Sequence, residues 1–256
     1  MDIVKLTKKT FENFTGQKRI IGKSVLGSPI YSFTVVKTGY PKLIVQSAMH
    51  AREYITAYLN LKLMERFIRC GRAGTVAFIP LINPDGVEIA LKKDGLYKAN
   101  ARGVDLNVNF DARWASGKSN VFERGSENYV GSAPFSEPET KALRDFTLLF
   151  APDCTISYHS KGQEIYYEFF QDSAKKERDF LLAEKVALST GYKIKSTPFS
   201  AGGYKDWCVE KLKIPALTIE VGSDDLSHPI GKENLYTIYS ENKCVIEDVI
   251  KHLLGE

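Results

Sequence analysis

The sequence has few cysteines, and their spacing argues against two common uses of this residue. Only four occur among the 256 residues, at positions 70, 154, 208 and 244, and no two of them form a CxxC pair. Structural zinc sites and dense disulfide scaffolds both need cysteines at short, regular spacings. We therefore expect buried free thiols and a reducing compartment.

Long apolar runs, linkers and repeats are also absent. No segment approaches the roughly 18 consecutive apolar residues of a membrane helix, and residues 1–14 lack the apolar core and cleavage site of a signal peptide. These absences predict a cytoplasmic protein without a membrane partner. No proline-, glycine- or serine-rich segment divides the chain, so we expect a single domain over residues 1–256. The net charge of +4 includes no basic stripe with interleaved aromatic residues, which argues against a nucleic-acid partner.

Apolar patterns along the chain predict strands that alternate with helices. We expect a β-hairpin over residues 19–36 around a turn at 26–29, strands at 42–46, 76–82, 154–158 and 215–221, and a turn at 83–86. Helical spacing predicts helices at 55–70, 138–150, 174–190 and 235–254; glycines at 71 and 191 would end the first and third, and Ser136 would cap the second. This alternation predicts an α/β fold, a three-layer α/β/α sandwich with a mixed, largely parallel central sheet.

A histidine and a glutamate lie three residues apart, shortly after the apolar run of residues 42–45. They are His50 and Glu53, in the segment Ser-Ala-Met-His-Ala-Arg-Glu-Tyr. Where a strand leads into the first turn of a helix, such a pair can direct an imidazole nitrogen and a carboxylate oxygen to one point. A zinc ion accepts both ligand types at about 2 Å, and catalytic sites add a third protein ligand and a water. The alternative is a solvated surface pair on a helix, since this spacing is common.

Two of the four histidines follow predicted strands. His159 ends one apolar run and His50 follows another, whereas we expect His228 and His252 to be solvated. Ligands of largely parallel sheets bind at the carboxyl ends of the strands. His50, Glu53 and His159 therefore form a candidate ligand set for a catalytic zinc ion, which would lower the pKa of water and polarise a carbonyl.

Two carboxylates complete the candidate site. Amide hydrolysis needs a group that takes a proton from water and returns it to the leaving amine. Glu220, at the end of the apolar run 216–219, is the candidate; the alternative is a helix cap or a salt-bridged glutamate. Asp105 is a candidate partner for the second N–H of His50, whose tautomer it would fix. The alternative for Asp105 is an ordinary turn residue.

Six ordered motifs resemble those of the M14 family of zinc carboxypeptidases, over almost the whole chain. They are His-Ala-Arg-Glu at 50–53, Asn-Pro-Asp-Gly at 83–86, Gly-Val-Asp-Leu-Asn-Val-Asn-Phe at 103–110, Pro-Phe-Ser-Glu-Pro-Glu-Thr at 134–140, Tyr-His-Ser at 158–160, and Asp-Trp at 206–207 followed by Thr-Ile-Glu at 218–220. By this resemblance the zinc ligands are His50, Glu53 and His159, with one ion per chain. Glu220 would be the general base and acid, and Asp105 would support a ligand.

Some positions depart from the family pattern. Val108 occupies the place of an arginine that holds the substrate's terminal carboxylate in classical members, and valine cannot do this. Lys98 stands where the family has an oxyanion-stabilising arginine, and a lysine can still stabilise a tetrahedral intermediate as a point charge. The family's mobile substrate-capping tyrosine falls near Pro198, and Tyr204 is out of register, so this role is unassigned.

Several residues are candidates for contact with the substrate. The resemblance implies this role for Arg52 and Asn107. Lys98, Arg102 or Lys205 is a candidate replacement for the lost carboxylate anchor in an enzyme that trims ordinary peptides. Lys205 falls where the family sets side-chain specificity, and a lysine there would favour a substrate with a carboxylate. The alternative for Lys205 is a side chain that extends to solvent.

A lost anchor for an ordinary C-terminus and a gained cation fit the branch of the family that acts on bacterial cell-wall peptides. We therefore expect a zinc metallopeptidase whose substrate is a peptide, a muropeptide of the γ-D-glutamyl-meso-diaminopimelate type. Two alternatives remain: a metallocarboxypeptidase that trims ordinary peptides, and a non-catalytic zinc-binding relative. The intact ligand set and the retained Glu220 argue against the last.

Overall fold

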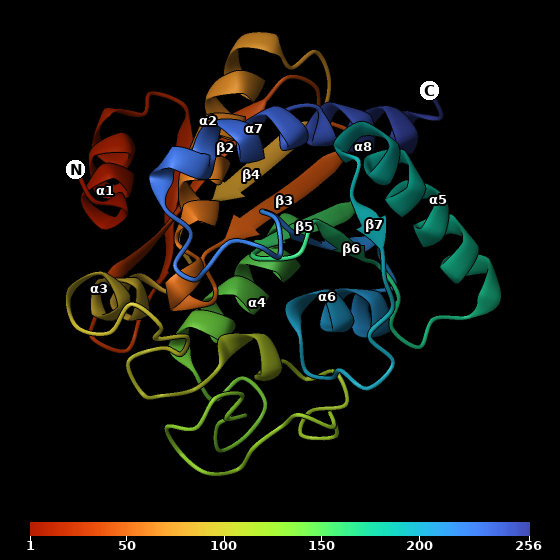
Figure 1. The fold of residues 1–256 in the computed structure, drawn as a ribbon. Coiled ribbons are helices and arrows are strands. Elements are labelled where there is room, and N and C mark those ends of the chain that lie inside the picture. Colours follow the sequence, from red (N-terminus) through yellow and green to blue (C-terminus); the bar gives the residue numbers. More distant parts are fainter.

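An eight-stranded sheet runs through the centre of the computed structural model, which describes residues 1–256 (Figure 1). In sheet order the strands are β1 (Gln17–Lys23), β2 (Pro29–Val36), β4 (Thr75–Ile79), β3 (Lys42–Ser47), β5 (Cys154–His159), β8 (Ala216–Glu220), β6 (Glu164–Tyr166) and β7 (Lys193–Ile194). The central strands β4, β3, β5 and β8 are parallel, whereas the pairs β1–β2, β2–β4 and β6–β8 are antiparallel. The predicted mixed, largely parallel sheet is therefore confirmed.

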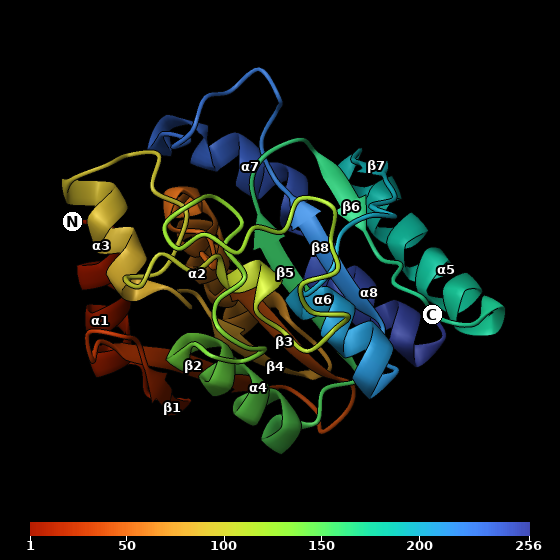
Figure 2. The same ribbon diagram turned by 90° about the horizontal axis from the view of Figure 1, so that it is seen from below.

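Helices cover both faces of this sheet. One face packs against α1 (Ile3–Asn13), α2 (Ile55–Cys70), α5 (Ser173–Thr190), α7 (Leu235–Asn242) and α8 (Val245–Leu254). The other packs against α4 (Pro138–Phe150) and α6 (Tyr204–Trp207), which lie in front of the sheet in Figure 2. The remaining helical segments are α3 (Pro84–Lys92), η1 (Ala51–Glu53), η2 (Leu106–Val108), η3 (Cys208–Leu212) and η4 (Lys232–Asn234). None of these helices combines the length and the apolar character needed to cross a membrane.

The two layers of helices enclose two separate apolar cores. Alternate residues of β3 point to opposite faces: Leu43 and Val45 belong to the core beneath α2, and Ile44 belongs to the core beneath α4. All three side chains are fully buried. Because both faces of the central strands are covered, these strands read as continuous apolar runs, which is why the sequence pattern identifies them.

Residues 83–86, predicted as a turn, begin α3 instead. Asn83 caps this helix, because its Oδ1 accepts a hydrogen bond from Gly86 N at 3.0 Å, and Pro84 follows as the first helical residue. Asparagine before proline is typical of turns, but it also provides a capping oxygen and a residue whose fixed φ suits the first helical position. The prediction of an isolated turn is therefore wrong.

The helix predicted over residues 235–254 consists of two helices, α7 and α8. Asn242, buried at the end of α7, donates a side-chain hydrogen bond to the carbonyl of Ile238 at 2.9 Å. Such bonding competes with the backbone N–H for the same carbonyl and favours a helix end.

The predicted cap of α4 is also wrong: Glu137 is the N-cap residue, and the Ser136 hydroxyl donates to the Glu137 carboxylate at 2.8 Å.

Several short or terminal elements escaped the sequence patterns. α1 has a capping residue, Asp2, whose carboxylate accepts from Lys5 N at 2.9 Å, but no helix was predicted there. β6 and β7 have only three and two residues, too few for a recognisable period. The strand predicted over 76–82 ends at Ile79, because Pro80 has no N–H to continue the ladder.

The four cysteines are free, as expected, but only two of them are buried. Cys154 and Cys208 lie in the interior, whereas Cys70 is exposed at the end of α2 and Cys244 is partly exposed between α7 and α8. The expectation of buried thiols is therefore wrong for Cys70 and Cys244, because both lie at helix ends near the surface.

Replacing Leu143 by alanine should lower the free energy of unfolding by about 2–5 kcal/mol. Leu143 is fully buried between α4 and the sheet, so the substitution leaves a cavity. Urea denaturation followed by circular dichroism measures the change. Leu149 in the same helix is 67% exposed, and its replacement by alanine should change stability by less than about 0.5 kcal/mol. Equal effects of the two substitutions would contradict this packing of α4.

Candidate metal centre

Three neighbouring strands end at the candidate metal centre. β3, β5 and β8 lie side by side and parallel, so their carboxyl ends meet at one edge of the sheet. His159 is the last residue of β5, Glu220 is the last residue of β8, and the two are register partners. His50 follows β3 and precedes η1, the helical turn that carries Glu53. The topology thus brings together four residues that are far apart in the sequence.

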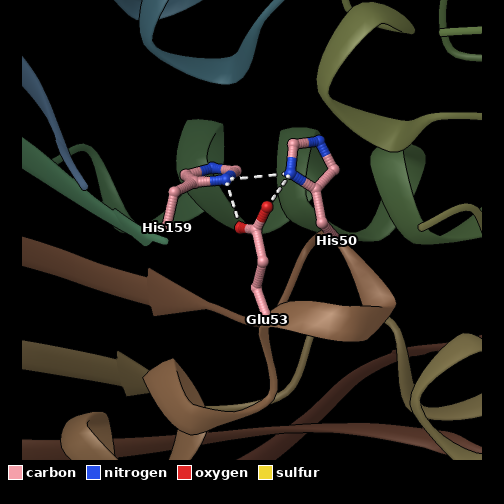
Figure 3. Close-up of side chains that lie close together, drawn as sticks. All are labelled: His50, Glu53 and His159. Atoms are coloured by element: carbon pink, nitrogen blue, oxygen red, sulfur yellow. Dashed lines mark hydrogen bonds and ion pairs between the residues drawn. The ribbon is translucent and has the colours of Figure 1, made fainter. Parts of the chain in front are cut away.

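The side chains of His50, Glu53 and His159 converge on one another (Figure 3). The Nδ1 atoms of the two histidines lie 3.2 Å apart; Glu53 places Oε1 2.8 Å from Nδ1 of His50 and Oε2 3.0 Å from Nδ1 of His159. All three residues are buried, with exposed fractions of 8%, 4% and 1%. The alternative of a solvated surface pair for His50 and Glu53 is therefore excluded.

This donor set fits a zinc ion. Two imidazole nitrogens and a carboxylate are common ligands of catalytic zinc, and ligand atoms about 2 Å from the metal lie about 3.3 Å from one another in a tetrahedral arrangement. The donor atoms of the three residues lie within 4.8 Å of one another, and their closest separations run from 2.8 to 3.2 Å. The three groups can therefore hold one divalent ion together.

Asp105 contacts His50 on the side away from the other ligands. Its Oδ1 lies 3.0 Å from Nε2 of His50, and its Oδ2 lies 2.7 Å from Nζ of Lys98. The same Oδ1 accepts a hydrogen bond from Asn107 N at 2.9 Å and caps η2. Asp105 is therefore both a turn residue and a partner of His50. A carboxylate at Nε2 favours a proton there and leaves Nδ1 available as a ligand.

Carboxylates dominate the electrostatics of the centre. Burial disfavours a charged His50, but the charges of Glu53 and Asp105 outweigh burial and raise the pKa of His50 to about 9. Burial likewise opposes ionisation of Glu53, yet the charge of His50 holds the pKa of Glu53 well below its usual range. Burial lowers the pKa of His159, which keeps that imidazole neutral. A field that favours a proton on His50 also favours a divalent cation, which would displace that proton.

The Glu220 side chain is partly buried, and one of its carboxylate oxygens has no partner. Its Oε2 is shielded from solvent and makes no hydrogen bond. Burial, and then the charge of Glu53, raises the pKa of Glu220 well above its usual range. A helix cap or a salt bridge is therefore excluded for this residue, and its carboxylate is available to exchange a proton.

Most of the chain, and not only this centre, matches a known family. The profile of the zinc carboxypeptidases, the M14 peptidases, matches residues 4–233. The chain belongs to the M14 zinc carboxypeptidase family. It is therefore a metallopeptidase of this family, and the resemblance drawn from the six motifs is confirmed.

Curated relatives of this M14 enzyme include two bacterial proteins. Gamma-D-glutamyl-L-diamino acid endopeptidase 1 of Lysinibacillus sphaericus is 29% identical over 257 residues, covering 86% of this chain and 64% of the relative. Murein peptide amidase A of Escherichia coli K12 is 29% identical over 223 residues, covering 80% of this chain and 83% of the relative. This chain thus spans slightly less than two thirds of the length of the Lysinibacillus protein.

Solved structures share the M14 fold with this chain. Bovine thrombin-activatable fibrinolysis inhibitor, in complex with tick carboxypeptidase inhibitor, superposes with a TM-score of 0.86 at 23% identity, covering 98% of this chain and 94% of the other. Murein-tripeptide amidase of Escherichia coli O157 superposes with a TM-score of 0.61 at 24% identity, covering 92% and 95% of the two chains. At these identities the comparisons establish a common fold.

Two hollows adjoin the candidate metal centre. The larger has a volume of about 410 Å³ and lies beside His50, Lys98 and Val108; we call it the His50 hollow. The smaller has a volume of about 170 Å³ and lies beside Glu220 and Lys205; we call it the Glu220 hollow. The two hollows share Asn107, Thr197 and Ser200 in their linings, so they adjoin each other.

Lys205 and Asn107 lie in these hollows, where the M14 resemblance places substrate. Asn107 lines both hollows. Lys205 lines the Glu220 hollow and is only 6% exposed, so the alternative in which its side chain extends to solvent is wrong. Tyr204 is fully buried and shares a hydrogen bond with the Thr147 hydroxyl at 2.8 Å, so it is not a mobile capping residue.

The two arginines predicted to contact substrate lie in different surroundings. Arg52 belongs to η1, next to the ligands; its Nη1 donates to Glu127 at 2.6 Å and its Nε is buried without a partner. Arg102 is half exposed, lies 3.5 Å from the Glu137 carboxylate and lines neither hollow. Neither arginine lines a hollow, although Arg52 adjoins the ligand Glu53 in η1.

His228, expected to be solvated, is half-buried. Its Nδ1 is shielded from solvent and has no partner. Burial lowers the pKa of His228, and the nearby charges of Glu53 and Arg52 also act on it. His228 is therefore less exposed than the polar sequence of its loop indicated. His252 is partly exposed on α8, closer to the expectation.

Tyr166 lines the Glu220 hollow, although no motif identified it. β6 places Tyr166 and Glu164 on one face and Ile165 in the core. The alternation of polar and apolar residues over 164–166 was the available signal. Three residues are too few to predict a strand, so this signal was too weak to use.

Proposed function

We propose that this M14 enzyme hydrolyses an amide bond in a carboxylate-rich peptide, a cell-wall muropeptide of the γ-D-glutamyl-meso-diaminopimelate type. The observation that carries the proposal is the buried ammonium group of Lys205 in the hollow beside Glu220. This ammonium group already contacts the Asp206 carboxylate and the Glu168 carbonyl oxygen, and its remaining N–H can donate to a carboxylate of the ligand. The names of the Lysinibacillus endopeptidase and the Escherichia coli amidase support the same substrate class.

Three side chains would hold the zinc ion, one per chain, and a fourth would orient them. The ligands are His50, Glu53 and His159, and Asp105 fixes the ring of His50. When bound, zinc supplies Lewis-acid chemistry, because it polarises a carbonyl and lowers the pKa of water. The burial of the ligands keeps bulk water away and strengthens each charge interaction at the centre.

Glu220 would move the proton. Its unpaired carboxylate oxygen accepts a proton from the attacking water and then donates it to the nitrogen of the leaving amine. Burial raises the pKa of Glu220, which favours its protonated form, the form that donates to the leaving amine in the second step. The residue that carries the leaving amine then lies next to Glu220, so its side chain enters the Glu220 hollow.

Lys98 would stabilise negative charge on the carbonyl oxygen. Its ammonium group lines the His50 hollow, 2.7 Å from Asp105 and 2.7 Å from Oδ1 of Asn128. The Asp105 carboxylate outweighs burial and raises the pKa of Lys98, which therefore stays charged. Val108, in the same hollow, offers no group for a terminal carboxylate. The proposed substrate is consistent with this loss, because its extra carboxylates lie away from the scissile bond.

Zinc-loaded enzyme should cleave L-Ala-γ-D-Glu-meso-diaminopimelate at least about tenfold more efficiently than the same peptide ending in L-lysine. The distal carboxylate of diaminopimelate can accept a charge-assisted hydrogen bond from Lys205, and such a bond contributes about 1.5–3 kcal/mol. Chromatography with mass spectrometry of the products gives kcat/KM for both peptides. Equal turnover of the two would remove the proposed role of Lys205.

The alternative of an ordinary carboxypeptidase is tested in the same assay. That enzyme would release C-terminal residues from hippuryl peptides, and amidation of the C-terminus would block the reaction. The muropeptide proposal predicts little activity on hippuryl peptides, because Val108 cannot anchor a terminal carboxylate. Rapid release from hippuryl peptides together with no cleavage of the tripeptides would replace the proposal.

A further inference from the structure

The Glu220 hollow contains a buried ion pair and not an isolated cation. Nζ of Lys205 lies 2.5 Å from Oδ1 of Asp206, and it also donates to the carbonyl oxygen of Glu168 at 2.8 Å. Asp206 is held in turn by the N–H of Gly203, at 3.0 Å from Oδ2. An ammonium group has three N–H donors, so one of them remains for a ligand. The position of this remaining donor is fixed, because its two neighbours are already engaged.

A second polar group faces the same hollow from β6. Tyr166 lines the hollow, and its hydroxyl donates its single proton to the carboxylate of Glu164. The lone pairs of the phenolic oxygen remain free to accept a hydrogen bond. Burial, and then the hydrogen bond to Glu164, raises the pKa of Tyr166, so the phenol keeps this proton. The oxygen is therefore a fixed acceptor with a carboxylate behind it.

Strand pairing places this acceptor next to the candidate base. Glu164 is the register partner of Glu220 across the β6–β8 pair, and Tyr166 is the register partner of Thr218. Thr218 and Glu220 also line the hollow. The hollow thus has a donor cation, Lys205, and a carboxylate-backed acceptor, Tyr166, on rigid elements beside Glu220. Neither the M14 motifs nor the names of the relatives assign a role to Tyr166 or Glu164.

We propose that the Glu220 hollow recognises a zwitterionic end group, with its carboxylate on Lys205 and its ammonium group on the Tyr166 hydroxyl, supported by Glu164. This inference rests on the proposed function in one respect, because it places the side chain of the leaving residue in this hollow. A carboxylate alone would leave the Tyr166 oxygen without a donor. An ammonium group alone would leave the third N–H of Lys205 without an acceptor, which is costly because Lys205 is buried.

Four tripeptides, L-Ala-γ-D-Glu-X, separate the two contacts. In X, the sixth carbon carries both an amino group and a carboxylate (meso-diaminopimelate), a carboxylate only (L-2-aminopimelate), an amino group only (L-lysine) or neither (L-norleucine). Each charged contact should contribute about 10- to 100-fold to kcat/KM. The diaminopimelate peptide should therefore be the best substrate, and the norleucine peptide the poorest.

Variants of the hollow should remove these contributions one at a time. Tyr166→Phe should bring the ratio of kcat/KM for diaminopimelate over aminopimelate close to one, and it should keep the preference for a carboxylate. Lys205→Met should remove the carboxylate preference and keep the amino-group preference. Tyr167→Phe is the matched control, because Tyr167 points to the opposite face of the sheet and belongs to the core beneath α2; its ratios should equal those of wild type.

The inference would be overturned if Tyr166→Phe kept the wild-type ratio of kcat/KM for the diaminopimelate peptide over the aminopimelate peptide. Ratios within one enzyme are insensitive to partial misfolding, so a merely structural role of Tyr166 would not change them. Cleavage of none of the four tripeptides would refute the proposed function, and the hollow would then be tested by calorimetric titration of free meso-diaminopimelate, L-2-aminopimelate and L-lysine. Preferential binding of diaminopimelate that Tyr166→Phe abolishes would support the inference. Equal binding or no binding of the three would overturn it.

Discussion

Glu220→Gln should lower kcat by at least about 10³-fold and leave one zinc ion per chain bound. Glutamine has nearly the shape of glutamate but cannot accept a proton, and general acid–base catalysis contributes about 10²–10⁴-fold at a single group. Glu220 acts twice in the proposed reaction, so we expect an effect in the upper part of this range. The substitution breaks no hydrogen bond at Oε2, because that atom has none. Steady-state kinetics with the diaminopimelate tripeptide and metal analysis by mass spectrometry measure the two quantities.

The matched control for this substitution is Glu210→Gln. Glu210 lies on η3, pairs with Arg113 at 3.1 Å and lines neither hollow, so kcat should be unchanged. A Glu220→Gln enzyme with kcat within tenfold of wild type would refute the assignment of the base. A different result would identify a binding protein that has kept the M14 fold. In that case wild type would show no turnover, and Glu220→Gln would bind the peptide with the same affinity as wild type.

His159→Ala should remove zinc from the protein and abolish activity. The substitution leaves two protein ligands, His50 and Glu53, where catalytic zinc needs three. The loss of affinity should exceed the roughly 10- to 100-fold cost of losing an outer partner such as Asp105. After dialysis against a weak chelator, wild type should retain one zinc ion and the variant should retain less than about 0.1 per chain. Because a ligand that binds only the folded state stabilises it, added zinc should raise the Tm of wild type more than that of the variant.

His252→Ala is the control for the loss of a histidine. His252 lies in the last turn of α8 and is partly exposed, so its replacement should change neither zinc content nor the response of Tm to zinc. Retention of one tightly bound zinc ion by His159→Ala would contradict the ligand set. The measurement does not depend on the identity of the substrate, so it tests the metal centre separately from the muropeptide proposal.

The central strands and the convergence of the candidate ligands could be predicted because one physical cause produces both signals. β3, β5 and β8 are covered on both faces, so they appear as apolar runs. Parallel strands also end at a common edge, where polar residues that follow the runs must meet. His50, His159 and Glu220 are such residues. Glycines also marked the ends of α2 and α5 correctly: Gly191 has a left-handed φ of 77°, whereas Gly71 has an extended backbone with a φ of −61°.

The rest of the site could not be predicted, because it depends on short strands and irregular segments. Tyr166 enters the Glu220 hollow from a three-residue strand without a usable period. The positions of Arg102 and His228 depend on the paths of long loops, which local propensities do not determine. The start of α3 at Asn83 is a different case, because the capping signal was present but has two meanings, a turn and a helix start.

The two outermost strands of the sheet affect how copies of this enzyme can meet. β1 carries Lys18, Arg19 and Lys23 along a mostly exposed edge, and β7 at the opposite edge has only two residues, one of which is Lys193. Charged or very short border strands resist backbone pairing with a neighbouring molecule. Growth of the sheet from one molecule into the next, the first step of many aggregates, is therefore disfavoured at both borders.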